Sequence, residues 1–162
     1  MNRLLTLIAL IFLFFFAELV CMNFLGRFLI PNFLILLVIF IDLHLGVRFG
    51  LFTAVLAGIL QDSFGTAAFG IHTFSFVFCV YVTTLLRRYF FYDMEFGFFR
   101  VLMACFISFL NVFTVYLLIS LSHALDFWEA TVFIIIPQVL VTTLLSTLIF
   151  KVLKRCVLKL SV

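Results

Sequence analysis

Long apolar runs separated by short polar breaks occupy almost the whole chain. A helix that crosses a membrane needs about 20 mostly apolar residues. The runs and their breaks predict six such helices, at about residues 4–25, 30–45, 47–61, 70–87, 97–121 and 131–150. Residues 151–162 then continue the last helix as a basic amphipathic tail. The pattern predicts an all-α integral membrane protein, a bundle of six transmembrane helices in one membrane domain, residues 1–162.

The separation of the second helix from the third depends on polar residues inside one apolar stretch. Residues 33–60 have the length of a single span, but Asp42, His44 and Arg48 lie near the middle, together with two glycines. A charge at the centre of a bilayer costs a few kcal/mol. These residues therefore favour two helices joined by a tight turn at the membrane interface.

The distribution of basic residues tests this choice, because cytoplasmic loops of membrane proteins are enriched in Lys and Arg. With six helices and a cytoplasmic N-terminus, nine of the ten basic residues fall on the cytoplasmic side, and Arg27 alone falls outside. If the second and third helices were fused, Arg87 and Arg88 would lie opposite the basic tail and the bias would largely vanish. We therefore expect both termini in the cytoplasm.

The composition excludes several classes of protein. A chain of 162 residues that is 67% hydrophobic and 10% charged is not a water-soluble domain. The net charge of +3 is too small to indicate nucleic-acid binding. The first apolar run has no small-residue cleavage site, so we read it as a retained span rather than a signal peptide. The four cysteines stand singly and the three histidines are dispersed, so we expect no metal site and no cofactor.

One helix face in the third predicted span carries small residues and a carboxylate. Gly50, Ala54, Gly58 and Asp62 are spaced by four, so they share a face that can pack closely against another helix. Two interpretations of Asp62 are open. It is either a helix-end acid exposed to water, or a carboxylate that orders the following outer loop or caps the start of the fourth helix.

Further residues on the outer side join this candidate site. Gly65 and Gly70 follow Asp62 in a loop that needs tight backbone turns. Pro31 and Asn32 begin the second helix, where Pro suits the first helical turn. Because the topology brings these segments to the same side, we expect Pro31, Asn32 and Asp62 to be neighbours.

Two polar residues lie inside predicted spans. Glu18 is about two-thirds of the way through the first helix, where an unpaired charge is costly. It requires a partner, protonation or a wet cavity, and Arg27 in the next loop is within reach. Asn111 in the fifth helix is typical of an interhelical hydrogen bond.

The sequence carries no motif of a catalytic centre. It lacks a Gly-rich phosphate loop, the H-E-x-x-H and G-x-S-x-G motifs, and any pair of carboxylates within one helical turn. We therefore expect a protein that is not an enzyme.

Two local patterns resemble those of the MreD family of bacterial rod shape-determining proteins. The first is the Pro31-Asn32 step that opens the second apolar run. The second is Gly58-Ile59-Leu60-Gln61-Asp62, followed by a loop with Gly65 and by Gly70 before an aromatic-rich span. The two patterns cover about residues 30–86, and Arg48 matches the family's usual basic residue after the second span. Glu18 and the 26 phenylalanines have no counterpart in the pattern.

The resemblance implies a non-enzymatic subunit of the cell-elongation complex in the bacterial inner membrane. Its implied partners are membrane lipids, an MreC-like membrane-anchored protein, the MreB filament, a glycan polymerase and a penicillin-binding transpeptidase. The implied role is to couple cytoskeletal filaments to peptidoglycan synthesis.

Two other functions are compatible with parts of the sequence. Substrate-binding subunits of energy-coupling-factor vitamin transporters are also six-helix proteins of this size, but the outer loops here lack the charged cluster that would grip a vitamin. A membrane enzyme would have to use Glu18 and Asp62, the candidate carboxylates of the outer half.

Overall fold

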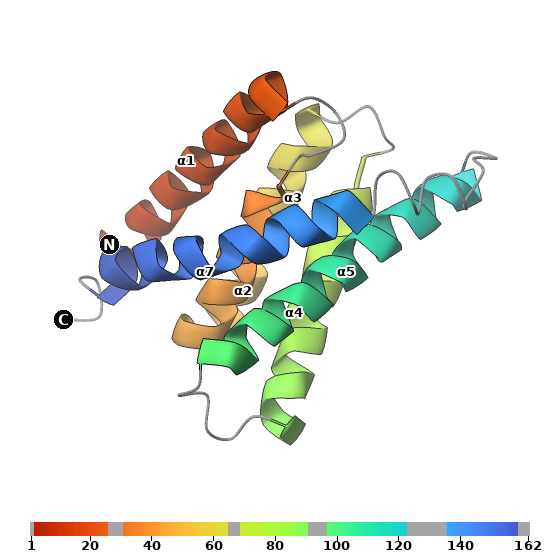
Figure 1. Ribbon diagram of the computed structural model, residues 1–162. Coiled ribbons are helices and arrows are strands. Elements are labelled where there is room, and N and C mark those ends of the chain that lie inside the picture. Colours follow the sequence, from red (N-terminus) through yellow and green to blue (C-terminus); the bar gives the residue numbers. More distant parts are fainter. Residues whose placement is uncertain (1, 26–30, 65–68, 91–96, 123–135, 159–162) are drawn as a thin grey trace.

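The computed structural model describes residues 2–25, 31–64, 69–90, 97–122 and 136–158. These ranges contain six helices and no strand (Figure 1). The helices are α1 (Asn2–Leu25), α2 (Phe33–Leu45), α3 (Val47–Phe64), α4 (Ile71–Phe90), α5 (Gly97–Ser122) and α7 (Ile136–Leu158). The prediction of an all-helical protein is confirmed for this part of the chain.

Four of these helices have the length and apolar composition needed to cross a membrane. They are α1, α3, α5 and α7. The apolar helix α2 has only 13 residues, which gives a length of about 20 Å against a hydrocarbon core of about 30 Å. The crossing of the membrane by all six helices therefore stays a prediction.

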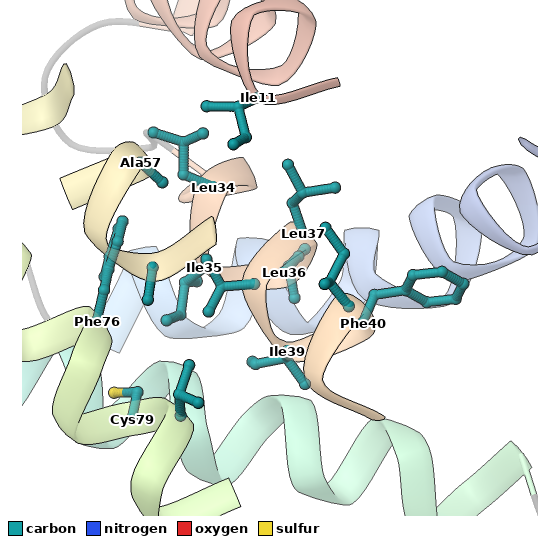
Figure 2. Close-up of a cluster of buried hydrophobic side chains, with 14 of the residues drawn as sticks. Ile11, Leu34, Ile35, Leu36, Leu37, Ile39, Phe40, Ala57, Phe76 and Cys79 are labelled. Atoms are coloured by element: carbon teal, nitrogen blue, oxygen red, sulfur yellow. The ribbon is translucent and has the colours of Figure 1, made fainter. Parts of the chain in front are cut away.

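The short helix α2 is the centre of the bundle. It contacts each of the other five described helices, and every residue from Leu34 to Leu43 is buried. Its side chains point in several directions, toward Ile11 of α1, Ala57 of α3 and Phe76 of α4 (Figure 2). A helix that is apolar all round is expected in such a fully surrounded place.

The start of α2 differs from the prediction. A helix was expected from residue 30, with Pro31 in its first turn, but α2 begins at Phe33 and Asn32 is its N-cap. The Oδ1 atom of Asn32 accepts a hydrogen bond from the Ile35 backbone N–H at 3.0 Å. An Asn side chain is among the best acceptors for the first helical N–H groups, so Pro31 is left before the cap.

The junction between α2 and α3 is formed by Gly46 alone. Its φ of 89° is a left-handed conformation that favours glycine, and its N–H donates to the Asp42 carbonyl oxygen at 3.1 Å. The sequence predicted a turn at this point and placed Asp42 near it, within the second predicted helix. Asp42 does lie in α2, but it is buried rather than at a membrane interface, because α3 and α4 pack against its side of the helix.

Candidate functional site

Buried and half-buried polar side chains gather where α2 and α4 begin. We call this group the helix-start cluster, and it comes from α1, the cap of α2, the end of α3, the start of α4 and α7. Its members are Glu18, Asn32, Gln61, Asp62, Thr73 and Thr142.

Glu18 of α1 closes the start of α2. Its Oε2 atom accepts a hydrogen bond from the Leu34 N–H at 3.4 Å, and its Oε1 atom accepts one from Gln61 Nε2 at 2.9 Å. The first N–H groups of a helix have no partner within the helix, and that end attracts negative charge. The Glu18 carboxyl group therefore provides an acceptor for a backbone N–H group at the buried start of α2. Its predicted partner, Arg27, lies outside the described residues.

Asn32 ties the same helix start to α7. Its backbone N–H donates to Thr142 Oγ1 at 3.2 Å, while its side chain caps α2. Both residues are buried, with 3% and 1% of their surfaces exposed. The start of α2 is thus bound to helices that flank it in space but are far away in the sequence.

Asp62, the last buried residue of α3, caps α4. Its Oδ1 atom accepts from the His72 N–H at 2.9 Å, and its Oδ2 atom accepts from the Thr73 N–H at 3.1 Å and the Thr73 hydroxyl at 2.6 Å. Gly70 precedes the helix with a φ of 101°, and its carbonyl accepts from the Phe74 N–H at 2.9 Å. Gly65 lies outside the described residues.

The small-residue face of α3 lies against its neighbours. A Cβ atom added at Gly58 would collide with the backbone of Thr73 in α4, and one added at Gly50 would lie 2.8 Å from the Asp42 Cβ atom. Ala54, between the two glycines, is fully buried. The face therefore contacts α2 near one end and α4 near the other.

Asp42 forms a second buried site at the opposite end of α2. The Thr84 hydroxyl donates toward its two carboxylate oxygens at 3.3 and 3.4 Å, and Arg87 Nη1 donates to its backbone carbonyl at 3.4 Å. Sequence reasoning missed this site because it used Asp42 only as one of the polar residues that mark the break between two helices. The available signal was the one that singled out Glu18, a carboxylate within an apolar run.

Asn111 makes the interhelical contact typical of its position. The Ser75 hydroxyl of α4 donates to Asn111 Oδ1 at 2.7 Å, between α4 and α5. The sequence did not indicate Ser75 as the partner.

Both carboxylates of the helix-start cluster accept hydrogen bonds from backbone N–H groups, and these bonds hold helices in position. Within the described residues, no group of three or more His, Cys, Asp or Glu side chains could hold a metal ion. A direct part of Pro31, Asn32, Gly58, Asp62 or Gly70 in partner binding stays a prediction.

The fold and the site define a class of protein, a helical membrane protein whose buried polar groups join its helices. Comparison with known families names the family. The profile of the rod shape-determining protein MreD matches residues 1–157, nearly the whole chain, so the chain belongs to the MreD family. No curated protein matches the chain, and no solved structure does.

Membership in this family assigns the protein a role in determining rod shape in bacteria. The family consists of structural membrane proteins and is not one of known enzymes. It also implies association with the rod-shape complex in the membrane.

Proposed function

We propose that this protein is a non-enzymatic inner-membrane subunit of the cell-elongation complex. In this role it couples an MreC-like protein and cytoskeletal filaments to the glycan polymerase and transpeptidase that build peptidoglycan. The observation that carries the proposal is the family match over residues 1–157. The bonding of the buried carboxylates agrees with it, because they join helices and so suit a protein that works as a rigid support.

The proposal includes six spans with both termini in the cytoplasm. Asp42 meets Thr84 and Arg87, so the C-terminal ends of α2 and α4 lie together. The rings of Phe40 and Phe150 are 5.8 Å apart, which brings α7 to the same end. The exposed basic residues near this end are Arg48, Arg87, Arg88, Lys151, Lys154 and Arg155. The enrichment of cytoplasmic segments in Lys and Arg supports placing this end in the cytoplasm.

The first test is affinity purification of the tagged protein from its native membrane in mild detergent, with mass spectrometry of the proteins that accompany it. We expect an MreC-like protein together with enzymes of peptidoglycan synthesis. Recovery of paired ATPases with a coupling membrane subunit would instead indicate a vitamin transporter. The family match gives that alternative no support.

A further inference from the structure

The exposed face of α7, a candidate membrane span, carries an apolar row that ends in positive charges. Leu140, Leu144 and Leu148 are spaced by four residues and are 58%, 74% and 60% exposed. Lys151 follows Leu144 by seven residues, and Arg155 follows Leu148 by seven. Residues at these spacings share one helix face, and both cations are exposed. We call these five residues the α7 strip.

The charged end of the α7 strip favours an anionic occupant. Lys151, Lys154 and Arg155 lie within about one helical turn of one another, and all three are exposed. Like charges at this spacing on a helix repel one another. The sequence of α7 contains no Asp or Glu that would offset them. An anionic group placed between these side chains relieves the repulsion.

The apolar end of the α7 strip suits lipid chains better than another helix. Helices pack together in membranes through small residues and groups that form hydrogen bonds across the interface. In α7 two such residues, Thr142 and Ser146, are on the buried face. The hydroxyl of Thr147, which is exposed beside the strip, donates to the Leu144 carbonyl oxygen of its own helix. The strip is thus left with bulky leucine side chains.

The length of the α7 strip matches one leaflet of a bilayer. From Leu140 to Lys151 it extends for about 16 Å, at 1.5 Å per residue. One leaflet contributes half of a hydrocarbon core of about 30 Å. An acyl chain that lies along the leucines therefore brings its headgroup to the level of the cations.

We propose that the α7 strip binds an anionic phospholipid, with an acyl chain along the leucines and the phosphate at Lys151 and Arg155. The Arg155 guanidinium offers several N–H donors in one plane, which suits phosphate oxygens, and the Lys151 ammonium adds a compact positive charge. Because the cations and the leucines share one face, a single amphiphile contacts both. A neutral lipid would cover the leucines equally well but would leave the cations without an anionic partner.

Fluorescence quenching by brominated lipids in reconstituted vesicles tests the proposal. The chain has one tryptophan, so Trp128→Phe provides a background in which Leu148→Trp reports from the strip. Phe12→Trp is the matched probe on α1, which starts at the end of the bundle where α7 ends (Figure 1). Phe12 is also exposed, and it lies as many residues from the start of α1 as Leu148 lies from the end of α7. Each probe is titrated with phosphatidylglycerol brominated on its acyl chains in phosphatidylcholine vesicles, and with the bromine on the phosphatidylcholine instead.

One cation at the membrane surface gives about a five-fold preference for an anionic lipid. We expect the preference for phosphatidylglycerol to be at least about five-fold greater at the α7 probe than at the α1 probe. The double variant Lys151→Gln/Arg155→Gln should abolish this difference, and Arg155→Lys should retain most of it. Arg88→Gln, which removes an exposed charge from the last turn of α4, should leave it unchanged.

Three results would overturn the proposal. The two probes would show the same preference, or the difference between them would survive the double variant or disappear in Arg88→Gln. In the last case the charge of the whole basic end, and not the α7 strip, would attract the lipid. Alternatively, the α7 probe would resist quenching by both lipids, which would mean that a protein surface covers the strip.

Discussion

Glu18 and Asp62 each provide hydrogen-bond acceptors for the start of another helix. Each carboxylate belongs to the preceding part of the chain and accepts hydrogen bonds from the first backbone N–H groups of a later helix. In a membrane interior no water replaces a missing partner, so an open helix start costs free energy. Side-chain acceptors from neighbouring helices remove that cost. We expect both residues to matter more for stability than their small number of contacts suggests.

Replacement of Glu18 by Ala should destabilise the protein. The Leu34 N–H and the Gln61 amide would lose their acceptor, and an unsatisfied buried donor costs about 1–3 kcal/mol. Glu18→Gln should cost less, because one acceptor oxygen remains. Both effects are measured by unfolding in SDS, followed by circular dichroism. Asn23→Ala is the control on the same helix, since its exposed side chain donates to the Leu19 carbonyl oxygen within α1. Equal stability of Glu18→Ala and Asn23→Ala would contradict the assigned role.

Replacement of Asp62 by Asn should weaken the cap of α4. An amide offers one acceptor oxygen where three donors now share two, and loss of a good N-cap costs about 1 kcal/mol. Thr73→Val removes the hydroxyl donor to Asp62, so the two substitutions should be coupled by about 0.5–3 kcal/mol in a double-mutant cycle. Ser63→Ala, which removes a hydroxyl bonded within α3, is the control. Strict additivity of the two substitutions would argue against the contact.

The same Asp62→Asn variant tests the functional importance of the end where α2 and α4 begin. In cells that depend on this copy, we expect loss of rod shape, recorded by microscopy alongside the protein level in the membrane. Normal rods at a normal protein level would remove Asp62 from the candidate site.

Two glycines of α3 allow close contacts with the neighbouring helices. Gly58 permits α3 to touch the backbone of Thr73 in α4, and Gly50 makes room for Asp42 of α2. Small residues are common at helix interfaces in membranes, because attraction there depends on close packing.

α1 has a different position, since among the described helices it contacts only α2 and α3. Much of its apolar surface, including Leu13 and Phe16, is exposed.

Gly58→Ala should force α3 and α4 apart. The added methyl group would meet backbone atoms of Thr73, which cannot rotate away, and overpacking of this kind costs about 1–3 kcal/mol. The better helix propensity of Ala, worth up to about 1 kcal/mol, offsets part of this cost. Val55→Ala, at an exposed position of α3, is the control in the same unfolding assay. If Gly58→Ala were as stable as the control, the close approach would be refuted.

The molecule has two chemically different ends. Glu18, Asn32 and Asp62 lie at one end, where the polar groups are buried and bonded to helix starts. Exposed Lys and Arg side chains lie at the other, beside the C-terminal ends of α2 and α4. In a bilayer this asymmetry favours one orientation over its inverse.

Cysteine labelling measures that orientation. In a chain whose four natural cysteines are replaced, Ser63→Cys and Lys154→Cys each introduce one thiol at an exposed position. We expect a membrane-impermeant maleimide to label Ser63→Cys while the inner membrane is intact, and Lys154→Cys only after that membrane is opened. The reverse order would place the basic end outside the cell.

The positions of the helices could be predicted from the chain alone, because apolar runs and their polar breaks are local properties. The shared face of Gly50, Ala54, Gly58 and Asp62 followed from their spacing for the same reason. The starting point of α2 was misjudged by a few residues, since Asn32 acts as an acceptor outside the helix.

The partners of the buried groups were decided only by the packing of the helices. The sequence indicated that Glu18 needs a partner, but Leu34 and Gln61 lie 16 and 43 residues away. No spacing rule joins residues on different helices, because their meeting depends on how those helices cross and on the turns between them. The burial of Asp42 and the central place of the short α2 depend on the same contacts. The local sequence thus shows which buried polar groups require a hydrogen-bond partner. The packing of the helices decides which residue becomes that partner.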